Sequence, residues 1–298
     1  MNITYSFIIP HRNTPELLNR LLNSIPERDD IQVIVVDDNS DIDKKPMINR
    51  DGVILLLLKE NETKGAGHAR NVGLEHAVGK WVLFADSDDF YEKSFVSILD
   101  KYIDKDIDIL FFNCKYVDSE SLKELSLFYV TDYINGYDGT NESLCNLKYR
   151  NNVPWSKMVR RDYISRYKFC FEEIQNGNDY MFSILIGHFC KKYEVEKNAL
   201  YIYTKGKNGL TNRKRMSETE HFCKLSYILK RHDLFSFLRL KKDKECYLLF
   251  YFWYLYRTRG IKESFRAFVL LISNFQCLFS ERRKYREAII MCERKGVV

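Results

Sequence analysis

Residues 80–90 read Lys-Trp-Val-Leu-Phe-Ala-Asp-Ser-Asp-Asp-Phe, an apolar run that ends in three carboxylates. The apolar part is typical of a buried strand, because it is short, lacks helical spacing and follows Gly79. Ligands bind at the carboxyl ends of strands in open α/β sheets, so acids here would lie at the mouth of a site. Mg²⁺ and Mn²⁺ take oxygen ligands, commonly one or two carboxylates plus the phosphates of a substrate. The stretch from Asp86 to Asp89 therefore fits either a cation site or a solvated acidic turn.

Apolar runs and helical patterns alternate before this stretch. Residues 3–9, 32–36 and 53–58 are predicted strands, and the first of them is expected to stop at Pro10. Thr14, followed by a proline, is expected to cap a helix between the first two strands. This rhythm predicts an α/β sheet of parallel strands with right-handed crossovers and helices on both faces.

The pattern after the acidic stretch is less regular. We expect a helix over 92–102, a strand over 108–112, short antiparallel strands within 115–139, a helix over 141–149, a helix beginning around Asp179 and a strand over 200–204. Beyond Arg215 the pattern changes to long helices without strands. The sequence thus predicts two parts, residues 1–215 and 216–298.

Composition restricts the class of protein. A chain of 298 residues with 45% hydrophobic and 14% aromatic residues can bury a large core. The N-terminus lacks the basic and apolar regions of a signal peptide. Eight cysteines are scattered without a Cys-x-x-Cys motif, which argues against a zinc site or a disulfide framework and favours a reducing cytosol.

Positive charge is concentrated at the C-terminus. Residues 216–298 contain 17 Lys and Arg against 9 Asp and Glu, whereas the rest of the chain contains 30 against 32. Two apolar stretches there, 246–256 and 265–279, are shorter than the ~20 residues that a membrane span needs. Three uses stay open: peripheral contact with a membrane, a homodimer interface, or packing against the first part.

A glycine-rich loop, Lys64-Gly-Ala-Gly-His-Ala-Arg-Asn-Val-Gly73, runs into a predicted helix. Gly65 and Gly67 permit close backbone approach, and a helix N-terminus favours anions, so the loop is a candidate phosphate cradle. It is not a P-loop, and Arg70 occupies the third glycine position of the dinucleotide motif. A plain tight turn is the alternative.

Taken together, the motifs resemble those of the family-two glycosyltransferases, which are inverting enzymes with the GT-A fold. The matching blocks, which span about the first 205 residues in the family's order, are Phe7-Ile-Ile-Pro10, Ile34-Val-Val-Asp-Asp-Asn-Ser40, Gly65 to Gly73, Phe84-Ala-Asp-Ser-Asp-Asp89, Trp155-Ser-Lys157 and Gly177-Asn-Asp179. The resemblance implies a GT-A catalytic domain over 1–215, with a mixed sheet flanked by helices. A basic, aromatic-rich helical region over 216–298 would extend it.

The resemblance also implies a nucleotide-sugar site. Its residues would be Pro10, Asp38, Gly65, Arg70, Asp86, Trp155 and Lys157. Pro10 and Asp38 would form the pocket for the base, and Arg70 would belong to the wall around the sugar nucleotide. A structural alternative for Arg70 is an ion pair that holds the glycine loop.

Asp86 and Asp88 match the family's Asp-x-Asp motif, which binds Mn²⁺ or Mg²⁺ and through it the diphosphate. Asp89 would support its neighbours. Asp179 matches the catalytic base, which takes the proton of the acceptor hydroxyl during a single inverting displacement. Its structural alternative is a helix N-cap, a role that is compatible with catalysis.

Two positions depart from the family pattern. Asn178 stands where Glu is common, which puts the local charge and acceptor choice in doubt. Leu210, within Gly209-Leu-Thr211, stands where the family often has Ser followed by Ile or Val.

Three other classes of protein fit parts of this pattern. A phosphatase of the haloacid dehalogenase type usually has Thr or Val where this chain has Phe90, and its motif lies near the N-terminus. A response-regulator receiver would explain Asp37 and Asp38 but would end near residue 120. A non-catalytic carbohydrate-binding or assembly subunit would have no need of Asp86, Asp88 and Asp179.

The expected function is transfer of one sugar from a nucleotide sugar, most commonly a UDP-sugar, to a glycan or lipid-linked acceptor in surface polysaccharide synthesis. The expected location is the cytoplasm, with peripheral contact at the inner face of the membrane through residues 216–298. No nucleic-acid partner is expected.

Overall fold

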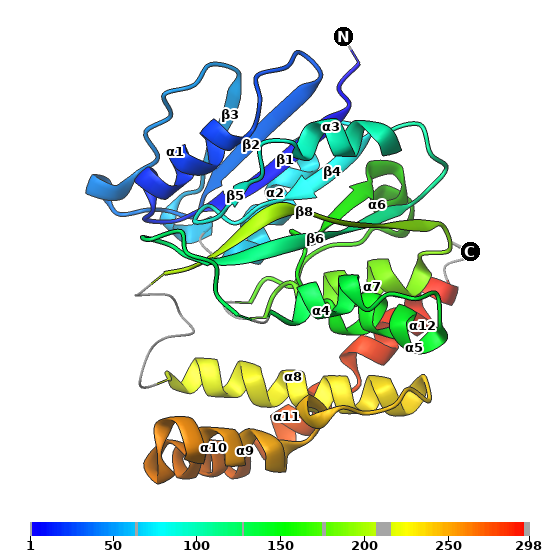
Figure 1. The fold of residues 1–298 in the computed structure, drawn as a ribbon. Helices are drawn as coiled ribbons and strands as arrows, with labels where there is room; N and C mark the ends of the chain where they lie inside the picture. Colours follow the sequence, from blue (N-terminus) through cyan, green and yellow to red (C-terminus); the bar gives the residue numbers. More distant parts are fainter. Residues whose placement is uncertain (1, 63–64, 127, 175–176, 207–215, 295–298) are drawn as a thin grey trace. The chain divides into compact units, whose positions relative to one another are not determined.

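The computed structural model describes residues 2–62, 65–126, 128–174, 177–206 and 216–294 (Figure 1). The chain divides into two compact units, residues 1–206 and 207–298, and each is described by itself. The predicted boundary between residues 215 and 216 lies at the edge of a segment that is not described, so it stays a prediction.

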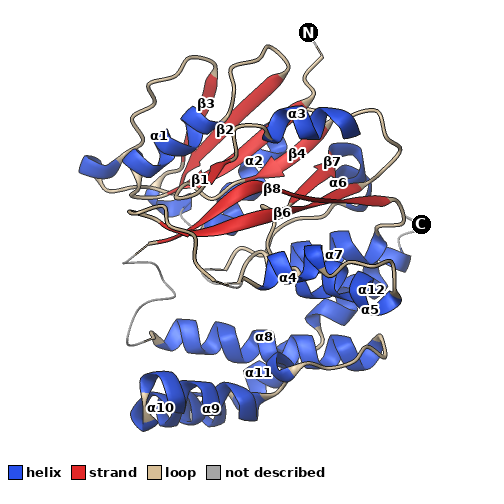
Figure 2. Ribbon diagram, in the orientation of Figure 1, coloured by secondary structure: helices blue, strands red, loops and turns tan. Residues whose placement is uncertain are grey.

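The N-terminal unit contains one mixed sheet with helices on both faces (Figure 2). The strands, in sheet order, are β3 (Val53–Leu57), β2 (Ile31–Asp37), β1 (Tyr5–His11), β4 (Trp81–Phe84), β7 (Lys157–Arg160), β6 (Ile109–Asp118), β8 (Tyr193–Lys205) and β5 (Phe90–Tyr91). Strands β1 to β4 run parallel, and β7 is antiparallel to both of its neighbours. The predicted α/β class is confirmed.

The helices of this unit surround the sheet. They include α1 (Pro15–Ser24), α2 (Ala66–His76), α3 (Phe95–Leu99), α4 (Tyr129–Asn135), α5 (Asn141–Cys145), α6 (Arg161–Tyr167) and α7 (Tyr180–Phe189). Of the short antiparallel strands expected within 115–139, the described residues form a single antiparallel bridge, between Val117 and Glu124. Strand β6 continues to Asp118 and α4 follows, because Val130 and Ile134 are buried at helical spacing rather than alternating.

Pro10 lies inside β1 rather than ending it, which corrects the predicted stop. The carbonyl oxygen of Ile8 accepts the Ala85 N–H. Backbone polar groups alternate sides along a strand, so those of positions 8 and 10 are both directed toward β4. Strand β4 ends opposite Ile8. The missing N–H of Pro10 therefore costs no ladder hydrogen bond, while the strand stays fully buried.

The described residues of the C-terminal unit form helices and short connections without a strand, as predicted. Its helices are α8 (Glu218–Phe237), α9 (Leu248–Arg259), α10 (Ile261–Ser273), α11 (Phe275–Glu281) and α12 (Lys284–Arg294). Helix α8 starts with a capping box, in which Ser217 accepts the Glu220 N–H and Glu220 accepts the Ser217 N–H. Helices α10, α11 and α12 pack against α8.

Candidate active site

Polar side chains follow three neighbouring strands of the sheet. Because β2, β1 and β4 are parallel, their carboxyl ends lie at one edge. His11 ends β1, Asp37 ends β2 with Asp38 directly after it, and the acidic stretch begins two residues after β4. The carboxyl edge thus brings the predicted base-pocket and Asp-x-Asp residues to one end of the sheet, where α/β proteins bind ligands.

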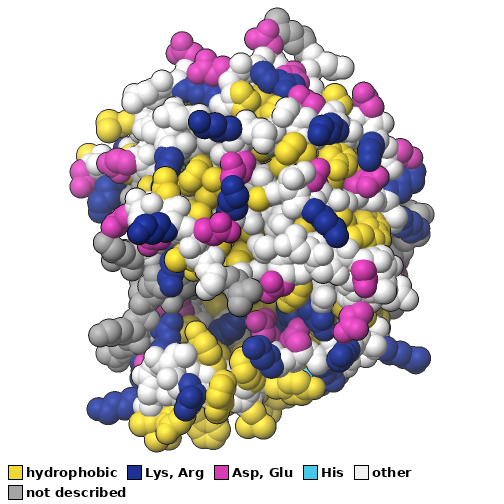
Figure 3. Space-filling view, in the orientation of Figure 1, with side chains coloured by type: hydrophobic (Ala, Val, Ile, Leu, Met, Phe, Trp, Pro, Cys, Tyr) yellow, Lys and Arg dark blue, Asp and Glu magenta, His cyan; other side chains and the backbone are white. Residues whose placement is uncertain are grey.

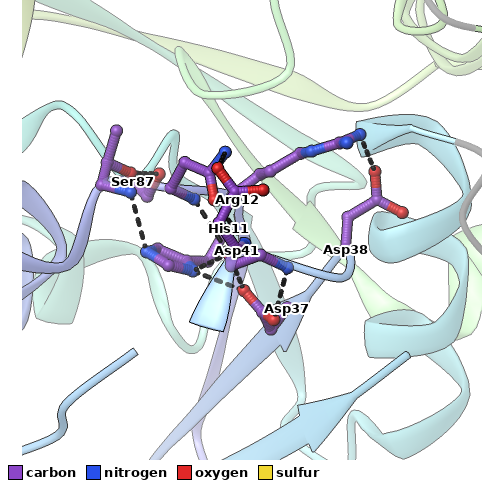
Figure 4. Close-up of polar contacts among 9 residues, drawn as sticks. His11, Arg12, Asp37, Asp38, Asp41 and Ser87 are labelled. Carbon is purple, nitrogen blue, oxygen red and sulfur yellow. Dashed lines mark hydrogen bonds and ion pairs between the residues drawn. The ribbon is translucent and has the colours of Figure 1, made fainter. Parts of the chain in front are cut away.

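A buried hydrogen-bond network fixes the loop after β2 (Figure 4). His11 Nε2 accepts the Thr14 N–H, so Nδ1 carries the proton and donates it to Asp37 Oδ1 at 2.7 Å. Asp37 also accepts the backbone N–H and the hydroxyl of Ser40. These residues were not among the predicted site residues, although a polar residue at the end of a buried strand was a usable signal.

Asp38 follows this network and is held in place by it. Its backbone N–H donates to the His11 carbonyl at 2.9 Å, and its side chain is 5% exposed. Arg12, whose side chain is 54% exposed, approaches the Asp38 carboxylate at 3.6 Å (Figure 4). Asp38 can therefore accept hydrogen bonds from a ligand at the strand ends, with a cation beside it.

Asp89 is the buried support of the acidic stretch. Its carboxylate accepts the Tyr201 hydroxyl at 2.7 Å and the Thr204 N–H at 2.7 Å. The Tyr201 oxygen in turn accepts the Asp86 N–H at 2.9 Å. Burial and the neighbouring carboxylates raise the pKa of Asp89 well above its usual range. This geometry agrees with the supporting role, and Tyr201 is a site residue that no local sequence signal indicated.

Arg70 joins the acidic stretch to the segment before α7. Its guanidinium donates to Asp86 Oδ1 at 2.6 Å and to the amide oxygen of Asn178 at 2.8 Å. The Arg70 side chain is 6% exposed, and its guanidinium lies 5.4 Å from the centre of the Phe171 ring. Because the Asn178 amide is neutral, the departure from Glu leaves Arg70 to balance the charge of Asp86.

Asp88 is pinned through its backbone. Its carbonyl oxygen accepts Arg20 Nη2 at 2.5 Å and the Thr204 hydroxyl at 2.7 Å. Burial, together with the charge of Asp86, raises the pKa of Asp88 to about 6. A cation shared by these two carboxylates would relieve that repulsion, so the pair fits a divalent ion.

No group of three or more His, Cys, Asp or Glu residues converges in a metal-binding arrangement in the described part of the chain. Asp89 uses its oxygens on Tyr201 and Thr204. Two carboxylates suffice for Mg²⁺ or Mn²⁺ when the phosphates of a substrate supply further oxygens. A metal held by Asp86 and Asp88 would accordingly depend on the substrate for part of its coordination.

Asp179 occupies the N-cap position of α7, but its side chain makes no capping hydrogen bond. The segment before it is fixed, since the Glu172 N–H donates to the Asn178 carbonyl and Asn178 binds Arg70. Burial is the main cause that raises the pKa of Asp179, to about 6. Asp179 is half-buried and directly follows Asn178, which binds Arg70. A carboxylate with such a pKa in this position is suited to accept a proton.

The glycine loop packs tightly against the same segment. Gly65, the N-cap of α2, has a φ of +89°, and a Cβ at Gly67 would lie 2.1 Å from the Glu172 carbonyl oxygen. The glycines thus allow close approach of two backbones. This agrees with the tight-turn alternative, and phosphate binding by the loop stays a prediction.

Trp155 precedes β7 and Lys157 begins it, in the strand that pairs antiparallel with β4. The Trp155 ring is 2% exposed and stacks on Tyr201 at 4.8 Å and on Tyr203 at 5.4 Å. Lys157 is fully buried, and its ammonium donates to the carbonyl oxygens of Asn151 at 2.8 Å and Val153 at 2.5 Å. These contacts hold both side chains in the interior of the unit. Direct contact of either side chain with a donor stays a prediction.

Replacing Lys157 with Met should lower the free energy of unfolding by about 2–4 kcal/mol, because two buried carbonyl groups lose their donor. Burial lowers the pKa of Lys157 to about 7, whereas an unfolded lysine titrates near 10.4. Between these two pKa values the unfolded chain binds more protons than the folded chain. The contribution of Lys157 to the free energy of unfolding therefore rises with pH. Urea unfolding should show that Lys157→Met loses more free energy of unfolding at pH 9 than at pH 7. The control Lys105→Met, at a half-exposed site, should show neither the loss nor its pH dependence.

Gly209, Leu210 and Thr211, the second departure from the family pattern, fall outside the described residues. The C-terminal unit contains a cavity of about 460 Å³ between α8, α11 and the start of α9, with Ile228, His232, Leu248 and Phe279 among its lining residues.

Comparison with known proteins identifies relatives along most of the chain. The model of glycosyl transferase family 2 matches residues 6–168. Poly(ribitol-phosphate) beta-N-acetylglucosaminyltransferase TarS of Staphylococcus aureus is 26% identical over 214 residues, which are 69% of this chain and 36% of TarS. A GalNAc(5)-diNAcBac-PP-undecaprenol beta-1,3-glucosyltransferase of Campylobacter jejuni is 33% identical over 115 residues, 37% of each chain. This chain therefore spans little more than a third of either relative.

The fold is shared with a solved structure. The crystal structure of S. aureus TarS 1–349 in complex with UDP-GlcNAc matches with a TM-score of 0.61 and 19% identity, over 99% of this chain and 92% of that one. The expected GT-A architecture, a mixed sheet with flanking helices and a helical extension, is thereby confirmed. Since the family model covers more than half of the sequence, the chain belongs to glycosyl transferase family 2.

Proposed function

We propose that this protein transfers a sugar from a nucleoside-diphosphate sugar to a hydroxyl group of a glycan acceptor. The observation that carries the proposal is the bridge made by Arg70. It binds Asp86 of the acidic stretch and Asn178, the residue before Asp179. One buried side chain thus connects Asp86, the proposed metal-binding acid, with the residue that directly precedes Asp179, the proposed proton acceptor.

Asp179 is the proposed base. It would take the proton of the acceptor hydroxyl as that oxygen attacks the anomeric carbon. A single displacement inverts that carbon, so an α-linked donor would give a β-linked product. Asp38, with Arg12 beside it, would bind the base of the nucleotide, and Pro10 would line the same pocket.

Asp86 and Asp88 are the proposed ligands of Mn²⁺ or Mg²⁺. When bound, the cation would stabilise the negative charge that develops on the departing diphosphate. The pairing of two acids with a raised Asp88 pKa supports this assignment, because a cation favours both charged forms. Arg70 keeps Asp86 oriented through its 2.6 Å hydrogen bond.

A UDP-sugar is the proposed donor, and a glycan or lipid-linked glycan of a surface polysaccharide is the proposed acceptor. The TarS structure contains UDP-GlcNAc, and the C. jejuni relative is named for an undecaprenol-linked acceptor. The matching location is the cytoplasmic face of the membrane, with residues 216–298 in peripheral contact or forming a homodimer.

The test is a panel of sugar nucleotides with and without Mn²⁺. One donor should raise the melting temperature only with the metal, since a ligand that binds the folded state stabilises it by mass action. The same donor should release free nucleoside diphosphate when an acceptor is supplied. Binding without release under all acceptors would favour the non-catalytic subunit instead.

A further inference from the structure

Helix α10 turns its apolar side outward. Five of its apolar side chains are 46–69% exposed, and they recur at helical spacing on one face. They are Ile261, Phe265, Phe268, Val269 and Ile272. On the inward side, Glu263 and Ala267 are buried. This arrangement is the reverse of an ordinary surface helix, which buries its apolar face.

Polar contacts fix this orientation. Glu263 Oε1 accepts the Met216 N–H at 2.7 Å and lies 3.1 Å from His221 Nε2, while Glu263 Oε2 accepts Arg266 Nη1 at 3.0 Å. The Tyr251 hydroxyl of α9 completes the network, 2.8 Å from His221 Nδ1. Turning α10 to bury its apolar side would strip a buried carboxylate of these partners, which is costly.

Helix α9 extends the apolar surface with aromatic side chains. Leu249, Trp253 and Tyr256 share one face of the helix and are 83%, 55% and 55% exposed. The Phe252 ring contacts the Phe268 ring edge-on at 5.9 Å and joins the two helices. Figure 3 shows apolar side chains gathered over α9 and α10 with basic side chains at the margin. We name the exposed apolar side chains of these two helices the hairpin face.

The exposed charged side chains within α9 and α10 themselves are of one sign. Between Cys246 and Ser280 the sequence contains a single acidic residue, Glu263, and that side chain is buried. Arg257, Arg259 and Lys262 lie at the turn between the helices. A second copy of this chain would bring the same cations to the interface, whereas anionic lipid headgroups would neutralise them.

We infer that the hairpin face is an interfacial anchor that inserts its aromatic and aliphatic side chains into the headgroup region of an anionic lipid bilayer. Trp and Tyr prefer this region, and flanking Arg and Lys bind lipid phosphates. No helix in the described part of the chain is long and apolar enough to cross a membrane, so the helices would lie along the surface. The inference rests on the peripheral membrane contact proposed for residues 216–298 and names the side chains that make it, and its test does not depend on the transferase activity.

Vesicle flotation of the full chain tests the anchor. Binding to phosphatidylcholine vesicles that contain one third phosphatidylglycerol should greatly exceed binding to pure phosphatidylcholine, and salt should weaken it. The double variant Phe265→Gln with Ile272→Gln should lose about tenfold or more in bound fraction, because both side chains are exposed and would be the buried area at the bilayer. Its melting temperature should stay unchanged.

Met291→Gln is the matched control, since Met291 is 54% exposed on α12 of the same unit. It should float with the anionic vesicles as the parent chain does. Equal binding of the parent to neutral and anionic vesicles, or equal loss in Met291→Gln, would overturn the anchor. The anchor would also be overturned if the parent chain does not bind vesicles and light scattering shows a dimer that the double variant no longer forms.

Discussion

Asp179→Asn is expected to lower the turnover number by about 10²–10⁴-fold, which is the usual contribution of a general base. Affinity for the nucleotide sugar should change little, because the amide keeps the size of the side chain and Arg70 binds Asn178 rather than Asp179. Single-turnover transfer assays and calorimetric titration of the donor measure the two quantities separately. Retained turnover would reject the assigned base.

The control is Asp162→Asn, which makes the same change at a side chain that is 75% exposed in α6. Its turnover should match the parent. The pH profile gives a second readout, since burial raises the pKa of Asp179 to about 6. The base must be a carboxylate, so kcat/KM should rise about tenfold per pH unit below that value and level off above it. In Asp179→Asn this inflection should vanish.

The carboxyl edge of the sheet was predictable because its residues carry local signals. A buried strand requires an apolar run, and the polar residues that end such a run must lie at the sheet edge. That reasoning placed Asp86 and Asp88 at the mouth of a site, and the family resemblance added Asp38 to it. The helical spacing after Asp179 located the start of α7. The α/β class followed from the same alternation.

The supports of the site were not predictable, since they come from distant parts of the chain. Tyr201 touches Asp89 across 112 residues, and Arg70 touches Asn178 across 108. No periodicity encodes such pairs. The burial of Lys157 likewise depends on the carbonyl groups that surround it. A sequence motif alone does not distinguish a lysine that contacts a ligand from one that holds a loop. Pro10 was misjudged because its effect depends on where β4 ends.

The second large effect concerns Asp88. In Asp88→Asn, the Kd for the nucleotide sugar in Mn²⁺ should rise by about 100-fold, as expected for loss of a metal-binding carboxylate. In EDTA the parent and the variant should bind equally weakly. Calorimetric titration under both conditions makes this comparison, and an unchanged Kd in Mn²⁺ would remove Asp88 from the metal site. Asp104→Asn, at a side chain that is 93% exposed, is the control.

Asp88 is a better probe than Asp86, and stability explains why. Removing Asp86 would leave Arg70, which is 6% exposed, without its ion pair, and breaking a buried pair costs about 3–5 kcal/mol. Asp88 has the opposite effect on stability, because burial and the charge of Asp86 raise its pKa to about 6. Above that pH its charge opposes folding, and below the unfolded value of about 3.9 the effect is gone. Metal-free Asp88→Asn should therefore melt no lower than the parent at pH 7, while gaining less from Mn²⁺ and donor. A residue that served the fold alone would show the reverse, a lower melting temperature with an unchanged gain.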